Sequence, residues 1–265
     1  MQTKTRNFLL IIFVLLTTYS IQAADHKWIA VFSKGTGFSS QAYESNGDWR
    51  ALMASVRKRN KQGYSITSIE YGAGIWFVVF SKGKNVEKTF IKKAKNWKSL
   101  VKLYQDEKKN GYKIVNLEYG NGNWVVLISK NRDKREQSIA QVRRWENISL
   151  MVRDKWIEGY DVIDIEHGKG TWTALFEKDT GFTTQRLSNS TKFNKFMANL
   201  EKRWKEKSKL INLEYGYGRW VAIYAKNTRY TNQGYVATRD WSDFNDEIKR
   251  RWRNGYYITD LAEGW

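Results

Sequence analysis

The sequence contains no cysteine, no proline and only two histidines among its 265 residues. The absence of cysteine excludes disulfides, thiolate metal ligands and a cysteine nucleophile. His26 and His167 are isolated and show none of the spacings typical of a metal site. No catalytic motif is recognisable in the rest of the chain. We therefore expect no metal ion, no cofactor and no enzymatic activity.

Long apolar runs are also scarce. A run that starts at Phe8 has nine residues, fewer than the roughly 20 that a transmembrane helix needs. It follows two basic residues and precedes Ala23 and Ala24, which is the layout of a signal peptide with a small-residue cleavage site. We predict a signal peptide over residues 1–24 and a secreted or periplasmic protein with no transmembrane segment in its mature part. The alternative is an N-terminal membrane anchor.

Acidic residues are the minority among the charged side chains. The chain has 27 Asp and Glu against 46 Lys and Arg, which gives a formal net charge of +19. Such a balance favours acidic partners without identifying one.

Tryptophan, in contrast, is abundant and regularly spaced. Of the 13 Trp residues, 12 fall into three columns in which the step is 48 residues. The first column is Trp28, Trp76, Trp124, Trp172 and Trp220; the second is Trp49, Trp97, Trp145, Phe193 and Trp241; the third is Trp156, Trp204 and Trp252. Five repeats of this length fill residues 26–265 as a single domain, and such repetition decides the fold.

Each repeat reads as strand, strand, helix, strand. The first strand is a continuous apolar run such as Trp76 to Ser81, typical of a strand covered on both faces. A more polar strand such as Glu87 to Ile91 follows. The helix comes next, with apolar residues at helical spacing. In the fifth repeat these are Trp241, Phe244, Ile248 and Trp252.

The end of each repeat predicts a helix stop and a hairpin. A glycine such as Gly255 suits a left-handed helix end. The last strand is expected to alternate, with Ile114, Asn116 and Glu118 on one side and Val115, Leu117 and Tyr119 on the other. A Gly-rich turn then leads into the next Trp strand.

The two ends of the chain predict how the repeats are joined. The first Trp strand and the last strand both lack a partner, and pairing the N-terminal strand with the C-terminal unit would remove both free edges. The sequence therefore predicts an α/β (α+β) repeat protein whose five strand-strand-helix-strand units close into a pseudo-five-fold, propeller-like toroid. An open solenoid is the alternative, although open arrays usually carry atypical capping repeats.

Three stretches carry a resemblance to a known family. They are Phe32-Ser-Lys-Gly-Thr-Gly-Phe-Ser-Ser-Gln41, Glu177-Lys-Asp-Thr-Gly-Phe-Thr-Thr-Gln185 and Ile248-Lys-Arg-Arg-Trp-Arg-Asn-Gly-Tyr-Tyr-Ile258. They resemble the repeat module of unassigned activity at the C-terminus of plant casein-kinase-I-like protein kinases, which implies a non-catalytic module; the kinase signature motifs are absent. The predicted ring also looks like the pentein α/β-propeller, but many enzymes of that fold use a Cys nucleophile, which this chain lacks.

A glutamate recurs at one position of four repeats. These residues are Glu70, Glu118, Glu166 and Glu214, with Ala262 in the fifth repeat. In a ring they would form a partial circle of carboxylates that binds a cation or supplies paired acids as in glycoside hydrolases. The structural alternative is that each glutamate accepts a hydrogen bond from a Lys, Arg or Trp of a neighbouring unit.

The loops after the first strand offer a second candidate site. A Thr-Gly-Phe-Ser/Thr-x-Gln pattern places Phe38 and Gln41 in the first repeat, and Phe182 and Gln185 in the fourth. Aromatic, hydroxyl and amide groups together are typical of a sugar or phosphate site. Turn formation alone also favours Gly and Thr.

Basic residues gather in the second halves of the helices, where the helix dipole by itself favours cations. The residues that we select as ligand-binding are Arg57, Lys58, Lys202, Arg203, Lys249, Arg250 and Arg251. Five such helices side by side would add their charges into one multivalent basic surface.

The sequence thus predicts a secreted, non-enzymatic binding protein for an acidic polysaccharide, an anionic lipid surface or a nucleic acid, with binding that weakens in salt. One alternative is a neutral-glycan or protein-binding repeat module that uses the Thr-Gly-Phe loops. Another is a glycoside-type hydrolase that uses the repeated glutamates.

Overall fold

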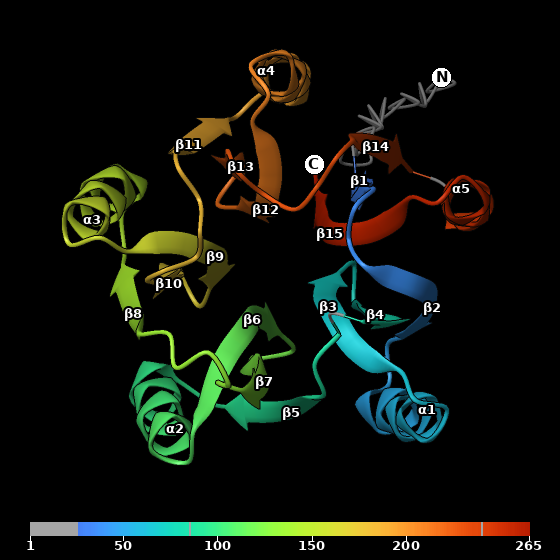
Figure 1. Ribbon diagram of the computed structural model, residues 1–265, viewed down its shortest axis with the longest axis horizontal. Coiled ribbons are helices and arrows are strands. Elements are labelled where there is room, and N and C mark those ends of the chain that lie inside the picture. The colour runs from blue at the N-terminus through green and yellow to red at the C-terminus, as the bar shows by residue number, and fades with distance from the viewer. Residues whose placement is uncertain (1–25, 85, 240) are drawn as a thin grey trace, which may run out of the picture.

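The computed structural model describes residues 26–265 except residues 85 and 240. The predicted signal peptide, residues 1–24, lies outside the described residues. The described chain forms five three-stranded sheets and five helices. Figure 1 shows the sheets arranged about a common centre, each with a helix on its outer side. The predicted α+β repeat organisation is confirmed.

All five helices are 13 residues long and begin at the second aromatic column, as predicted. They are α1 (Trp49–Lys61), α2 (Trp97–Lys109), α3 (Trp145–Ile157), α4 (Phe193–Lys205) and α5 (Trp241–Arg253). Asp48 caps α1 by accepting from the Ala51 N–H, and Asn96 caps α2 within a capping box. Helices α3 and α4 have no side-chain cap. The common starting point therefore depends on the apolar stripe that packs against the sheet rather than on capping.

Each sheet contains three kinds of strand. The central strands are β1 (Lys27–Ser33), β4 (Ile75–Gly83), β7 (Asn123–Lys130), β10 (Thr171–Glu177) and β13 (Arg219–Ala225). The outer strands are β2 (Phe38–Asn46), β5 (Thr89–Ala94), β8 (Gln137–Val142), β11 (Gln185–Ser190) and β14 (Gln233–Thr238). The inner strands are β3 (Ser65–Gly72), β6 (Tyr112–Gly120), β9 (Asp161–Gly168), β12 (Lys209–Gly216) and β15 (Tyr257–Gly264).

Every sheet combines two strands of one sequence repeat with the central strand of the next. Thus β2 and β3 flank β4, and the pattern continues to the fourth sheet. The fifth sheet takes its central strand from the start of the chain. Strand β1 pairs antiparallel with β14 and with β15, with Trp28 opposite Thr238 and Glu263. The predicted pairing of the N-terminal strand with the C-terminal unit is therefore present.

The central strands are buried because both of their faces are covered. In β7, Trp124, Val126 and Ile128 pack in the core under α2, whereas Val125 and Leu127 join the core under α1. This double coverage explains the uninterrupted apolar runs in the sequence. The Trp residues that begin the central strands are at most 4% exposed, so this column forms core.

The inner strands do not alternate as predicted, because each contains a β-bulge. In β6, Ile114 lies opposite Ile128 and Asn116 opposite Leu127, so Val115 is an extra residue. The bulge places Ile114 and Leu117 together in the core under α2 rather than on opposite sides. Equivalent register shifts occur in the other four sheets. The residues left unpaired by the five bulges are Thr67, Val115, Ile163, Ile211 and Thr259.

The inner strands contact one another in chain order, and β15 also contacts β3. At each junction a glycine of one inner strand lies against a side chain of its neighbour. Gly120 lies against Tyr71, Gly168 against Tyr119, Gly216 against His167, Gly264 against Tyr215, and Gly72 against Glu263. A Cβ at any of these glycines would lie within 2.4 Å of that side chain. Glycine is required here by close approach rather than by backbone conformation.

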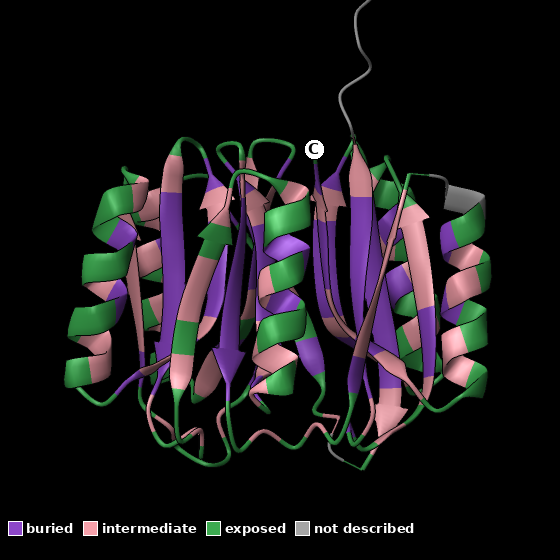
Figure 2. Cartoon of the chain, turned by 90° about the horizontal axis from the view of Figure 1, so that it is seen from above, coloured by how far each residue is buried: buried purple, intermediate pink, exposed green. Residues whose placement is uncertain are grey.

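The two ends of the molecule carry different connections between the elements, as Figure 2 shows. One end, the hairpin face, carries the helix N-termini and four two-residue turns in which both residues have positive φ, such as Asn121-Gly122. The other end, the loop face (bottom of Figure 2), carries the helix C-termini and the loops that follow the central strands. These loops are residues 34–37, 84 with 86–88, 131–136, 178–184 and 226–232.

Candidate functional site

Five lysines occupy one repeat position on the loop face. Each lies at or next to the end of a central strand, and consecutive members are 48 residues apart. They are Lys34, Lys82, Lys130, Lys178 and Lys226. We call this set the lysine circle. Since every sheet contributes one member, the lysines surround the centre of the loop face.

Four members of the lysine circle rest on the tyrosine of a Gly-Tyr turn. The Nζ atoms of Lys34, Lys82, Lys130 and Lys178 lie 4.7, 4.3, 4.0 and 4.6 Å from the ring centroids of Tyr256, Tyr64, Tyr112 and Tyr160. A cation over an aromatic face is stabilised by about 0.5–1 kcal/mol at an exposed site, which holds the ammonium group in place at the surface. Lys226 has Ser208 in the equivalent position and is exposed. Lysine is thus present even where there is no tyrosine to hold it.

Two cavities open at the centre of the loop face. The larger has a volume of about 350 Å³ and the smaller about 250 Å³. The five bulge residues line them: Ile163 and Ile211 the larger, and Thr67, Val115 and Thr259 the smaller. The bulges therefore aim one side chain of every unit at the central opening. Arg229 and Tyr230 line both cavities and divide them.

Arg229 and Tyr230 come from the fifth loop, residues 226–232. The guanidinium carbon of Arg229 lies 5.9 Å from the ring centroid of Phe38 and 5.9 Å from that of Tyr230. Burial raises the pKa of the Tyr230 hydroxyl, while the Arg229 charge and hydrogen bond lower it. No carboxylate forms an ion pair with Arg229 among the described residues. The equivalent positions in the first and fourth loops are Gly37 and Gly181, so this cation breaks the five-fold repetition.

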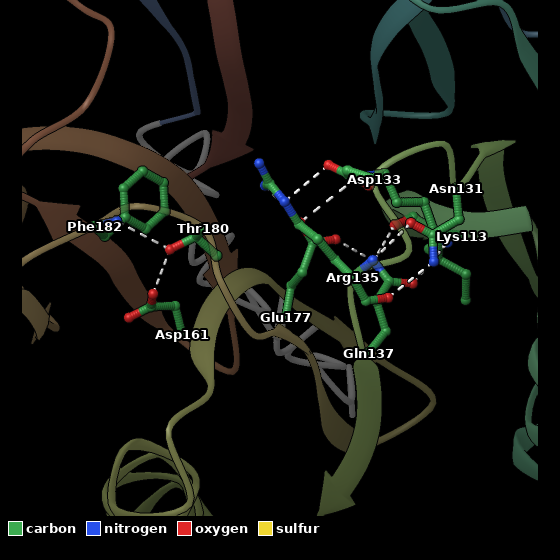
Figure 3. Close-up of polar contacts among 10 residues, drawn as sticks. Lys113, Asn131, Asp133, Arg135, Gln137, Asp161, Glu177, Thr180 and Phe182 are labelled. Atoms are coloured by element: carbon green, nitrogen blue, oxygen red, sulfur yellow. Dashed lines mark hydrogen bonds and ion pairs between the residues drawn. The ribbon is translucent and has the colours of Figure 1, made fainter.

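A charge-balanced cluster forms part of the cavity wall, and Figure 3 shows its contacts. Arg135 lies 2.8 Å from Asp133 and 2.9 Å from Glu177, and Lys113 lies 3.2 Å from Asp133. Gln137 donates to Glu177 at 2.8 Å. Because two cations face two carboxylates, the cluster rigidifies the wall and adds little net charge.

The predicted aromatic residues of the Thr-Gly-Phe loops do reach the central opening. Phe182 lines the larger cavity and Phe38 the smaller. Thr180 donates to Asp161 and accepts from the Phe182 N–H at 3.1 Å, which fixes the loop (Figure 3).

The two predicted glutamines of these loops line neither cavity. The Gln185 amide donates to the Val162 carbonyl at 2.7 Å and accepts from Val162 N–H and from Trp156 Nε1, both at 2.8 Å. Gln41 makes the equivalent bonds to Ile258 and Trp252. Both side chains clamp a strand to its neighbour, so their polar atoms are occupied within the fold.

The predicted basic residues of the helices lie at the rim of the loop face rather than in one patch. They are distributed over α1, α4 and α5, which Figure 1 shows as separate helices on the outside. Arg203 pairs with Glu206 at 2.8 Å, and Arg250 and Arg251 both pair with Glu247. Lys249 lies 3.9 Å from Asp246. Arg57, Lys58 and Lys202 are exposed, and within the described chain they have no ion pair.

The repeated glutamates lie at the centre of the fold and are buried. Glu70, Glu118, Glu166 and Glu214 are between 3% and 7% exposed, and none lines either cavity. Each accepts a backbone N–H from an adjacent inner strand, as when Tyr119 N donates to Glu166 at 3.2 Å. The structural role predicted for them is therefore present, but the donors are backbone groups rather than Lys, Arg or Trp side chains.

Burial also controls the protonation of these acids. It raises the pKa of each of the four glutamates well above the ordinary value, and repulsion by neighbouring carboxylates raises it further. Burial also raises the pKa of Asp164, two residues before Glu166 in β9, to about 6. Among the described residues no group of three or more His, Asp or Glu is placed to hold a metal ion.

Sequence reasoning missed the lysine circle and Arg229. The lysine circle had a signal in the sequence, since its members keep the same 48-residue step as the Trp columns. Arg229 had none, because its place over the central opening depends on the path of one loop.

Comparison with family models gives a match. The model of a family described as a domain of unknown function (DUF7477) matches residues 15–163, more than half of the chain. A search of curated proteins found no match. In the described part of the chain, no helix combines the length and the apolar character needed to cross a membrane.

Proposed function

We propose that this chain, which belongs to the DUF7477 family of unknown function, is a secreted or periplasmic, non-enzymatic protein that binds an acidic polymer on its loop face. The observation that carries the proposal is the lysine circle. Five cations at one repeat position, of which Lys178 is also paired with Glu136 at 3.2 Å, give a polyanion several contacts, and each contact adds to an overall avidity.

The architecture that we propose with this function is a closed five-fold ring. The contact of β15 with β3 and the seat of Glu263 on Gly72 support closure, since they repeat the contacts between consecutive units. Closure would fix the spacing of the five lysines. The exposed Arg57, Lys58 and Lys202 would extend the basic surface outward.

Among acidic polymers, an acidic polysaccharide fits the loop face best. The central opening offers Phe38, Phe182 and Tyr230 beside hydroxyl and amide groups, a combination suited to sugar rings as well as to charge. Anionic lipid vesicles and single-stranded DNA are the comparison ligands, because a surface that recognises only negative charge would bind both of them.

The test removes three members of the lysine circle and measures binding to polygalacturonate at increasing salt. We expect Lys34→Gln/Lys82→Gln/Lys226→Gln to lower affinity at low salt by about tenfold or more and to flatten the dependence of log affinity on log salt, because fewer counterions are released. The matched control is Lys95→Gln/Lys98→Gln/Lys195→Gln, which removes three exposed charges from the hairpin-face end of α2 and α4. Equal losses in the two triple variants would contradict the proposal.

A second candidate function is binding of a neutral glycan, because Phe38 and Phe182 flank the opening. Such binding would persist at high salt and would not respond to the lysine variants.

A further inference from the structure

The larger cavity at the centre of the loop face has features that electrostatic binding of a polymer would not require. Its volume of about 350 Å³ lies at the lower end of the roughly 300–1,000 Å³ typical of small-molecule sites. Ile163 and Ile211 give it an apolar floor, and Phe182 and Tyr230 give it aromatic sides. It is therefore a shaped pocket within a basic face.

Arg229 gives this pocket a cation that is available to a ligand. The other arginine of the lining, Arg135, is paired with Asp133 and Glu177. In the described part of the structure the Arg229 guanidinium lies near the Phe38 and Tyr230 rings and is hydrogen-bonded to the Tyr230 hydroxyl, and no ion pair reaches it. An aromatic setting of this kind orients a guanidinium without neutralising it, which leaves its paired N–H donors for a planar anion.

The remaining polar groups of the pocket are few and partly occupied. Thr228 accepts from the Tyr230 N–H at 3.3 Å and keeps its own hydroxyl proton. Asn227 donates to the Gly181 carbonyl at 2.6 Å and keeps its carbonyl oxygen. Two donors, the Thr228 hydroxyl and the second Asn227 amide N–H, and one acceptor, the Asn227 carbonyl oxygen, thus remain in the lining. This set suits a small molecule with hydroxyl groups.

We infer that the larger cavity binds a single uronic acid unit, a sugar ring that carries a carboxylate, with the carboxylate on Arg229 and the ring between Phe182 and the isoleucine floor. This inference rests on the proposed function. It identifies the acidic polymer as a carboxylated polysaccharide and assigns one of the polymer's units to a specific binding site. A simple inorganic anion would use Arg229 alone and would leave the apolar floor and the aromatic sides without a partner.

The buried carboxyl group of Asp260 does not prevent such binding. Asp260 lies near Tyr230 and influences its hydroxyl. Burial raises the pKa of Asp260 well above its ordinary value, and the charge of Asp164 raises it further. Asp260 therefore holds its proton at a higher pH than an exposed aspartate does.

The test uses the full mature chain and D-galacturonate as the probe, with methyl galactoside and sulfate as comparison ligands. Binding is followed by the methyl NMR signals of Ile163 and Ile211 and by calorimetry. We expect saturable binding of galacturonate with shifts of both isoleucines, and at least about tenfold weaker binding of both comparison ligands, since neither offers a carboxylate and a sugar ring together.

Two substitutions of Arg229 separate charge from geometry. Arg229→Gln should weaken galacturonate binding by about tenfold or more, and Arg229→Lys should weaken it several-fold because the forked bidentate contact is lost. The control is Arg50→Gln, an exposed arginine in the first turn of α1 at the opposite face, which should bind as the wild type does. Thermal melts of all three variants show whether the fold is retained.

The outcomes distinguish this inference from the proposed function. If polygalacturonate binds through the lysine circle but galacturonate does not bind, or binds equally well to Arg229→Gln, the pocket assignment is wrong and the proposed function stands. Equal binding of sulfate and galacturonate would also overturn it in favour of a simple anion site. If neither the polymer nor the monosaccharide binds, both are wrong.

Discussion

At the scale of single residues, the buried glutamates determine how stability depends on pH. Glu118 is 3% exposed, and no ion pair reaches it in the described part of the chain. Its pKa is raised first by burial and then by the charges of Glu214 and Asp164. The folded state therefore binds more protons than the unfolded state at pH values between the unfolded and the folded pKa.

The sign of this linkage gives a prediction. The stabilising effect of protonation is fully present below the unfolded glutamate pKa and is lost as pH rises through the raised folded values, including the value of about 6 for Asp164. Wild-type stability should therefore fall from about pH 5 to pH 8. Glu118→Gln should be more stable than the wild type at pH 8 by roughly 1–2 kcal/mol, because the amide keeps an acceptor for the Tyr71 N–H and carries no charge.

Urea unfolding at pH 5 and pH 8 measures this difference. The gain in Glu118→Gln should shrink at pH 5, where the buried carboxyl is protonated in the folded state and, like the amide, carries no charge. Glu201→Gln, on the exposed side of α4, is the control and should give the same stability as the wild type at both pH values. A wild-type stability that rises with pH would contradict the protonation of the central acids.

At the scale of elements, the end of α4 departs from the other helices. Gly63, Gly111, Gly159 and Gly255 follow the other four helices with φ between 71° and 83°. Lys207 takes the same left-handed conformation with φ of 61° after α4. A side chain in this region costs about 1–2 kcal/mol relative to glycine.

Replacement of this residue by glycine is expected to stabilise the protein. Lys207→Gly should raise the free energy of unfolding by about 1 kcal/mol, and the melting temperature by about 2–4 °C. Lys207→Ala removes the same charge but keeps the Cβ, so it should gain much less. The reverse change, Gly159→Lys, should lose a similar amount, since no atom lies within 4 Å of its Cβ position and the backbone alone is strained. Equal stability of Lys207→Gly and Lys207→Ala would show that the left-handed conformation is not the cause.

The elements also show how far the sequence predicts the structure. Helix starts and central strands were predictable, because each follows from a hydrophobic period or from coverage on both faces. The bulges were not, since Ile114 to Tyr119 reads as an ordinary alternating strand and the extra residue is defined only by the partner strand. The central opening depends on those bulges. Phe38 and Phe182 were predicted from loop composition. Gln41 and Gln185 belong to the same sequence pattern but lie on the outer strands β2 and β11, where their amides bond to a neighbouring inner strand.

At the scale of the whole molecule, the proposed function depends on whether the five units form a closed ring. Four junctions between inner strands join units that are consecutive in sequence, and each has a glycine under a neighbouring side chain. The contact of Gly72 with Glu263 joins the first unit to the last and has the same geometry, with a Cβ at Gly72 lying 2.2 Å from the Glu263 Cβ. In an open array, this fifth glycine would face solvent.

This difference allows closure to be tested by stability alone. In a closed ring, Gly72→Ala should destabilise the protein by about 2 kcal/mol, similar to Gly120→Ala, because an extra methyl group is forced into a filled contact. Glu263→Gly removes the opposing Cβ, so the double variant should recover part of the loss, and the coupling energy should exceed about 0.5 kcal/mol. Glu263→Gly combined with Gly120→Ala is the control pair and should be additive, since Gly120 lies against Tyr71 instead. A protein that tolerates Gly72→Ala but not Gly120→Ala would have an open junction between β15 and β3, and the lysine circle would then have no fixed spacing with which to hold a polymer.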